Sequence, residues 1–190
     1  MQQSDNTEIN PRFLLPEHLS LKSGPSEKEI KEKRLFLAPG SQVMGDISFG
    51  DDVSIWFNAV VRADLSRISL GSSTNIQDGA ILHVANDFEC KIGSLVTVGH
   101  GAIIHAATIE KGVLIGMKSV ILDDALIGEG SIIAAGAVIR RGEMVDPFSL
   151  MAGVPARKIR SLTHENLEEN INLAKKYVLL KDAYLKNTAV

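Results

Sequence analysis

A six-residue repeat of large apolar side chains constrains this chain more than any other feature. The repeat begins at Leu37, slips at residues 67–69 and 85–91, shortens once before Ile109 and ends at Met151. A small side chain stands four residues after most of these positions, and glycine often follows the large residue directly. A period of six fits neither a helix, with 3.6 residues per turn, nor a long strand, which alternates every two residues. The repeat positions are Leu37, Val43, Phe49, Ile55, Val61, Leu70, Ile76, Leu82, Ile92, Val98, Ile104, Ile109, Ile115, Ile121, Ile127, Ile133, Ile139, Val145 and Met151.

Short strands joined by tight corners, three to a turn, explain this period. Stacked turns form a parallel β-helix, an all-β solenoid in which the large residue fills the interior and the small residue fits the corner. Hairpins packed in a β-sandwich also give short apolar runs between Gly-rich turns. Nineteen positions in nearly constant register favour the solenoid. We therefore predict a β-helix domain over residues 35–160.

Different patterns flank the repeat. Residues 1–34 are mostly polar and proline-rich, which predicts an N-terminal arm. Within it, Ser26 and Glu29 have the spacing of a capping box, which indicates a short helix. After Thr163, apolar residues recur at helical spacing. Residues 163–187 are therefore predicted to form a C-terminal α-helix of about twenty residues that packs on the β-helix.

Composition narrows the possible function classes. The chain has 190 residues, 45% of them apolar, which suits one domain with short appendages. A net charge of −3 without a long Lys/Arg run argues against nucleic acid or a membrane as a partner. The single cysteine, Cys90, excludes an intrachain disulfide, and no apolar stretch has the length of a signal-peptide core or a membrane span. A cytoplasmic protein is the expectation.

The register of the repeat brings two histidines together. Counting through the slips puts Arg62, His83 and His105 directly after repeat positions of the same face in three successive turns. They should form one outward column, with turns about 4.8 Å apart. Two imidazoles at that separation can bind one metal ion at Zn–N distances of about 2.0–2.1 Å.

A third histidine, His100, falls on a different face, with Asp78 one turn away, and is not expected to reach that metal ion within its own chain. A three-histidine site closes if the protein is a homotrimer whose axis runs parallel to the β-helix, because this face then meets the histidine column of the next chain. Three neutral imidazoles with one open position lower the pKa of zinc-bound water to about 7. Zinc is the predicted metal, and iron or cobalt would accept the same ligands.

Polar side chains surround the predicted metal site. Arg62 and Asp64 are interpreted as an intersubunit ion pair, and Asp78 as the residue that orients His100. Gln77 has two interpretations, a hydrogen bond to a metal-bound hydroxide or a structural role at a corner of the coil.

Three segments of the chain closely resemble a known family, the gamma-class carbonic anhydrases and their bacterial homologues. The segments are VRADLSRISLGSSTNIQDGAILHV, VGHGAIIHAATI and GMKSVILDDALIGEGSIIAAGAVI. The repeat alone is shared with many acyltransferases, but a larger set of polar residues is specific to the family: Arg62, Asp64, Gln77, Asp78, His83, His100 and His105. The resemblance implies a left-handed β-helix and zinc bound by the histidines across the interfaces of a homotrimer. It also implies reversible hydration of carbon dioxide to bicarbonate, with the glutamine near the bound hydroxide.

The chain departs from the archetype of that family at the proton shuttle. Two glutamates of the archetype correspond to Leu65 and Asn86 here, and the acidic loop that carries one of them is much shorter. Asp87 or Glu89 is the expected substitute in moving a proton to buffer. Tyr177 resembles a tyrosine that some short-loop relatives place near the metal.

Two other functions remain open from the sequence. A hexapeptide-repeat acyltransferase uses the same kind of coil, binds coenzyme A between subunits and carries its basic histidine on a long inserted loop, whereas the loop at residues 85–91 is short. A metal-binding trimer without turnover, serving as a structural subunit, is the second alternative. The neutral residues at the shuttle positions favour it.

Overall fold

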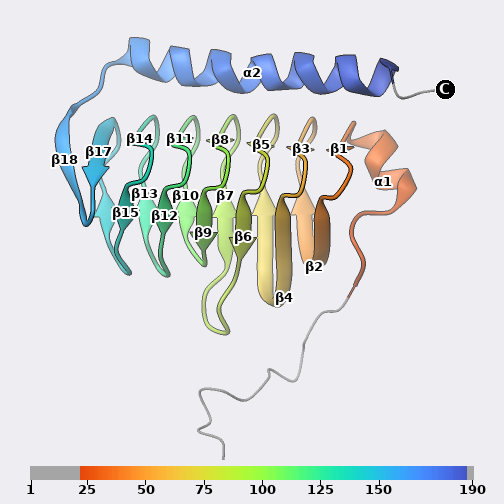
Figure 1. Ribbon diagram of the computed structural model, residues 1–190, viewed down its shortest axis with the longest axis horizontal. Helices are drawn as coiled ribbons and strands as arrows, with labels where there is room; N and C mark the ends of the chain where they lie inside the picture. The colour runs from red at the N-terminus through yellow and green to blue at the C-terminus, as the bar shows by residue number, and fades with distance from the viewer. Residues whose placement is uncertain (1–21, 188–190) are drawn as a thin grey trace, which may run out of the picture.

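The computed structural model describes residues 22–187, so the first 21 residues of the predicted arm lie outside the described residues. The chain winds into a parallel β-helix, with one long helix along its side and one short helix at its N-terminal end (Figure 1). The elements are α1 (Glu27–Glu32), β1 (Phe36–Leu37), β2 (Gln42–Phe49), β3 (Ser54–Ile55), β4 (Val60–Leu70), β5 (Asn75–Ile76), β6 (Ile81–His83), β7 (Cys90–Ile92), β8 (Thr97–Val98), β9 (Ile103–His105), β10 (Thr108–Ile109), β11 (Leu114–Ile115), β12 (Val120–Ile121), β13 (Leu126–Ile127), β14 (Ile132–Ile133), β15 (Val138–Ile139), β16 (Met144–Val145), β17 (Ser149–Gly153), β18 (Ala156–Ser161) and α2 (His164–Asn187).

The strands stack into three faces, which confirms the predicted solenoid. One sheet runs β1-β3-β5-β8-β11-β14-β17, parallel throughout, and ends on β18. A second runs β15-β12-β9-β6-β4 on one face and continues through β4 into β7-β10-β13-β16 on the next. In β4, Val60–Arg62 pair with β6 and Ile68–Leu70 pair with β7, so a single strand spans two faces. The extra residues of β4 explain the slip in the repeat at residues 67–69.

Large aliphatic side chains fill the interior of the coil. Ile55, Ile76 and Val98 pair in register on one face, and each is fully buried. Small side chains such as Ala80 and Ala102 are buried at the corners, where a larger group would not fit. Each such isoleucine contributes about 1.5–3 kcal/mol through burial of its side chain. The core therefore extends along the whole solenoid, one layer for each turn.

The two ends of the solenoid are closed differently. At the N-terminal end, the amide of Glu29 donates to the Ser26 hydroxyl at the start of α1, as the capping-box spacing predicted, and Ile30 packs against the core. At the C-terminal end, β17 and β18 form an antiparallel hairpin that ends the parallel stacking. The six-residue repeat gives no indication of this hairpin.

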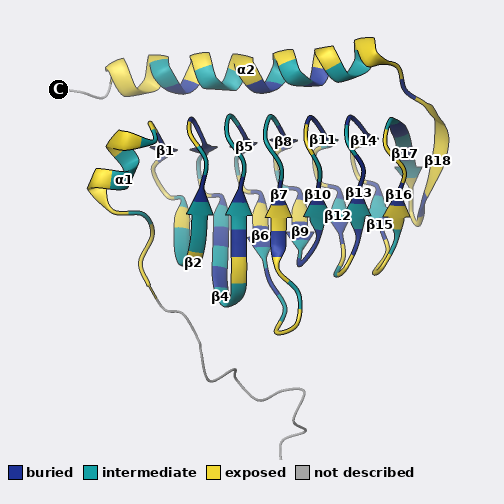
Figure 2. Ribbon diagram, turned by 180° about the vertical axis from the view of Figure 1, so that it is seen from behind, coloured by how far each residue is buried: buried dark blue, intermediate teal, exposed yellow. Residues whose placement is uncertain are grey.

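The predicted C-terminal helix is present as α2, which returns along the solenoid from the β18 end to the β1 end (Figure 1). It packs against β3, β5 and β8, and its coil-facing side is buried while its outer side is exposed (Figure 2). Asn170, Ala174 and Lys181 are its buried residues, and Asn170 donates to the Gly112 carbonyl (3.0 Å). In the part of the chain that the structure covers, no helix has the length and apolar character needed to cross a bilayer.

Candidate metal centre

His83 and His105 occupy the same position in two successive turns. They are Cα partners at the ends of β6 and β9, and Arg62 is the partner of His83 in the turn before. This is the column that the repeat predicted. The ring centroids are 5.0 Å apart, and His83 Nδ1 lies 3.0 Å from His105 Nε2.

An aspartate contacts the remaining nitrogen of each ring. Asp64 Oδ1 lies 3.0 Å from His83 Nε2, and Asp123 contacts His105 Nδ1. Burial would raise the pKa of Asp64, but hydrogen bonds from His83 and Arg62 outweigh it and leave the pKa below its usual range. Burial lowers the pKa of His83, although Asp64 partly opposes the shift. At neutral pH the first pair is therefore an ionised aspartate beside a neutral imidazole.

This protonation pattern fits a metal ion. An ionised carboxylate only accepts hydrogen bonds, so the ring nitrogen that faces it carries the proton and the other nitrogen keeps a lone pair. His83 Nδ1 and His105 Nε2 lie 3.0 Å apart, and when the ring proton of each histidine is on the nitrogen beside its aspartate, both of these nitrogens offer a lone pair to one cation. Two nitrogens bound to one tetrahedral zinc at 2.0–2.1 Å are about 3.3 Å apart. The donor set and its spacing suit zinc, and imidazole also suits iron or cobalt.

His100 lies on a different face, as predicted. It follows β8 in the first sheet, and its Nδ1 lies 2.7 Å from Asp78 Oδ2. The other oxygen of Asp78 accepts from the amide of Phe57 (3.1 Å), so the aspartate is held by the neighbouring turn. Within residues 22–187 of one chain, no three metal-binding side chains come together. A three-histidine site would therefore need a second chain.

Gln77 and Tyr177 lie on the His100 side of the chain. Gln77 is buried, and its Nε2 donates to Asn75 Oδ1 (3.1 Å), which ties it into the sheet. Tyr177 stands edge-on to Trp56, with 5.4 Å between centroids. Burial, with a smaller contribution from the charge of Asp78, raises the pKa of Tyr177. Its phenol is protonated at neutral pH and can donate a hydrogen bond, but it is not a base there.

The acidic residues expected to shuttle protons lie on the face next to the histidine column. Asp87 and Glu89 line a shallow cleft together with Ala106, Thr108 and other residues of the next turns. Glu89 pairs with Lys91 at 3.0 Å. The cleft begins one residue beyond His105, on the next face of the coil, so these carboxylates are offset from the histidine column.

Two features of the site were not anticipated. Asp123 was not predicted as a site residue. It lies two residues after Ile121, which pairs in register with Ile104, the residue before His105. That register was the signal that could have found it. Arg62 and Asp64, interpreted as an intersubunit pair, contact each other within the single chain, and Asp64 connects Arg62 to His83.

The coil defines the chain as a hexapeptide-repeat protein with a left-handed parallel β-helix. Residues 106–141 match the family described as bacterial transferase hexapeptide (six repeats). Gamma carbonic anhydrase 1 of Arabidopsis thaliana, a mitochondrial protein, is 34% identical over 184 residues, which are 94% of this chain and 67% of that protein. A carbonic anhydrase of Geobacillus kaustophilus is 41% identical over 143 residues, 75% of this chain and 79% of that protein. The chain belongs to the gamma carbonic anhydrase family.

Solved structures share the fold. A proposed acetyltransferase of Bacillus cereus superimposes with a TM-score of 0.77 at 39% identity, over 79% of this chain and 87% of that one. The same coil is thus found in proteins to which different activities are ascribed, and the choice between them depends on the side chains.

Proposed function

We propose that the protein is a zinc-dependent carbonic anhydrase of the gamma class, with its metal sites between the subunits of a homotrimer. His83 and His105 of one chain and His100 of the next are the ligands in this proposal. The observation that carries it is the pair of stacked imidazoles, in which His83 Nδ1 and His105 Nε2 lie 3.0 Å apart while an aspartate contacts the other nitrogen of each ring. The relatives that carry the name carbonic anhydrase support the same reading.

The face beside the histidine column supports assembly. Val60, Ile81, Ile103 and Val120 pair in register and point outward from β4, β6, β9 and β12. Ile81 and Ile103 are 38% and 37% exposed in the single chain. A neighbouring chain that covers this apolar column would bury it and bring its own residues to the histidines.

Each residue near the site then has a definite task. His83 and His105 of one chain with His100 of the next would hold a zinc ion, which would supply a nucleophile for carbon dioxide hydration by lowering the pKa of water. Asp64 contacts His83 Nε2 (3.0 Å) and Asp78 contacts His100 Nδ1 (2.7 Å), which would leave the other nitrogen of each ring for the metal. Tyr177 and Gln77 come from the chain that supplies His100. Tyr177 would donate a hydrogen bond near the metal position, and Gln77, which donates to Asn75 Oδ1, is held in the sheet beside it.

Proton removal is the step for which this chain is least equipped. Leu65 and Asn86 stand at the positions where the archetype has glutamates, and neither can accept a proton. Asp87 and Glu89 are the nearest substitutes by sequence, and the cleft that they line offers a route for buffer. Because both lie beyond the histidine column, proton transfer through water is expected to limit turnover.

Mixing two inactive variants tests the shared site. His83→Ala chains still supply His100, and His100→Ala chains still supply the His83/His105 pair. When the two are unfolded together and reassembled at equal amounts, about one quarter of the clefts in a random trimer population receive an intact set. Metal content and carbon dioxide hydration should both return to about that fraction of the wild-type values.

The matched control mixes His83→Ala with His105→Ala. No chain in that mixture carries the intact pair, so neither metal nor activity should return. Recovery in the control, or no recovery in the first mixture, would contradict a site divided in this way between chains.

An acyltransferase is the second candidate, because the matched repeat family and the Bacillus cereus structure carry transferase names. The loop between β6 and β7 is short and contains no histidine to serve as a base. A calorimetric titration with acetyl-CoA distinguishes the two functions. Binding in the micromolar range would favour the transferase, and we expect none.

A metal-binding trimer without turnover is distinguished by rate. Stopped-flow hydration of carbon dioxide should be faster with the zinc- or iron-loaded protein than with the His83→Ala variant treated with metal in the same way. Equal rates for the two proteins would leave only a structural role for the metal.

A further inference from the structure

Each of the three histidines contacts an aspartate of its own chain, and a task is given above to Asp64 and Asp78 but none to Asp123. We propose that Asp123 is a positioning residue that holds His105 with its Nε2 toward the metal position shared with His83. The inference rests on the proposed metal site and adds a residue to it.

The backbone around Asp123 is fixed from two sides. The carbonyl of Asp123 accepts from the amide of Gly142 (2.9 Å), and the amide of Asp124 donates to the carbonyl of Ala106 (2.9 Å). Because Ala106 directly follows His105, the second bond ties the corner of Asp123 to the corner of its partner. Asp124 has φ 58°, so the chain turns away immediately after Asp123. The Asp123 carboxylate is thus presented to His105 by an anchored corner.

This contact decides which nitrogen of His105 is available. The carboxylate contacts Nδ1 and favours the tautomer with the ring proton on that nitrogen, which leaves a lone pair on Nε2, the nitrogen beside His83. Without Asp123 the proton can occupy either nitrogen, and the ring can turn about its Cβ–Cγ bond. Both changes reduce the fraction of the protein that is ready to bind metal.

A purely structural role for Asp123 is the competing explanation. The side chains of Asp123 and His105 are 28% and 34% exposed, and hydrogen-bonded pairs at such positions contribute little to folding. Loss of Asp123 should therefore weaken metal binding much more than it weakens the fold. Asp124 offers a matched comparison, because it has the same charge on the same corner but lines the cleft near Glu89.

The test measures metal binding directly. Zinc affinity is determined by competition with a chelator, and the visible spectrum of the cobalt-loaded protein reports the ligand geometry. Asp123→Ala should weaken zinc binding by about 10- to 100-fold and change the cobalt bands. Asp123→Asn keeps an oxygen that accepts from Nδ1 but lacks the charge, and a loss of about 3- to 10-fold is expected. Asp124→Asn should match the wild type.

The outcomes separate this inference from the proposed function. Wild-type protein that binds neither metal would overturn both. Wild-type protein that binds zinc, with Asp123→Ala equal to it in affinity and cobalt spectrum, would overturn only the role of Asp123. If Asp123→Ala fails to assemble, Asp123→Asn decides: weaker binding by a folded trimer supports the inference, and unchanged binding refutes it.

Discussion

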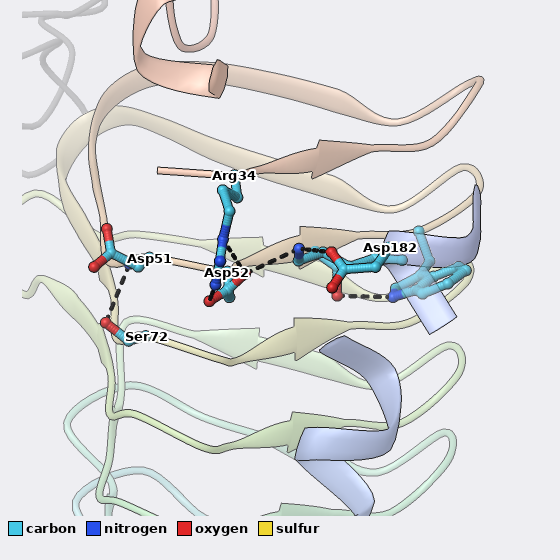
Figure 3. Close-up of polar contacts among 8 residues, drawn as sticks. Arg34, Asp51, Asp52, Ser72 and Asp182 are labelled. Carbon is cyan, nitrogen blue, oxygen red and sulfur yellow. Dashed lines mark hydrogen bonds and ion pairs between the residues drawn. The ribbon is translucent and has the colours of Figure 1, made fainter. Parts of the chain in front are cut away.

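The ammonium group of Lys181, on the inner side of α2, lies 3.0 Å from the carboxylate of Asp52, in the turn before β3. Lys181 is fully buried, and Asp52 also pairs with Arg34 beside α1 (Figure 3). Asp182 completes the network (Figure 3), because its Oδ1 accepts a hydrogen bond from Lys181 Nζ at 2.6 Å. Residues 34, 52 and 181 are far apart in the sequence, so the network fastens the end of α2 to the first turns of the solenoid.

Removal of the lysine charge should loosen this attachment. Lys181→Met keeps the bulk of the side chain but leaves Asp52 with Arg34 as its partner. We expect the free energy of unfolding to fall by about 2 kcal/mol, less than for a buried charge left wholly unpaired. Urea denaturation measures the change. Asp182→Asn, at a side chain that is 42% exposed, is the matched control and should change stability by less than about 1 kcal/mol.

The same network predicts a pH dependence. Burial alone would raise the pKa of Asp52, but hydrogen bonds from Arg34 and Lys181 outweigh it, so the pKa lies below its usual value. The stability that Asp52 contributes is therefore present above the unfolded pKa of about 3.9 and is lost as the pH falls through the lower folded value. Both the wild type and Asp52→Asn are treated with a chelator. Their urea midpoints should differ most near neutral pH and converge below about pH 4. A constant difference across this range would show that the charge of Asp52 does not stabilise the fold.

Much of the site could be predicted because the six-residue repeat assigns each residue to a face and a turn of the coil. Once Val61, Leu82 and Ile104 are assigned to one face, the column of Arg62, His83 and His105 follows from register alone. The placement of His100 beside Asp78 follows in the same way.

Other contacts depend on geometry that the repeat does not contain. The register places Asp123 near His105, but its contact with the ring also needs the turn at Asp124. Asp64 reaches His83 where β4 crosses from one face to the next. The burial of Lys181 could not be predicted either. A lysine on a helix is usually exposed, and this one is buried beside a carboxylate more than a hundred residues earlier in the chain. A count of apolar positions predicts the stacking of turns but not the polar contacts between corners.

The apolar column on the histidine face yields a test of assembly. Ile103→Lys places a charge on a side chain that is 37% exposed in the single chain, so the coil itself should tolerate it. Between subunits the same ammonium would be buried without a partner, and the trimer should dissociate to monomers. Light scattering gives the mass, and elemental analysis should show that metal is lost with the trimer. Leu179→Lys, at a position on α2 that is 71% exposed, should leave both unchanged.

Tyr177 provides a test that separates catalysis from metal binding. Tyr177→Phe keeps the ring against Trp56, 5.4 Å between centroids, and removes only the hydroxyl. If that hydroxyl donates a hydrogen bond near His100, kcat/KM for carbon dioxide hydration should fall by about tenfold, the equivalent of one hydrogen bond of 1.4 kcal/mol. Metal content and trimer mass should stay at wild-type values. Tyr184→Phe is the matched control, because Tyr184 packs on the same indole, also at 5.4 Å, and has no proposed role in hydration. Equal rates for the two variants and the wild type would reduce Tyr177 to a packing residue.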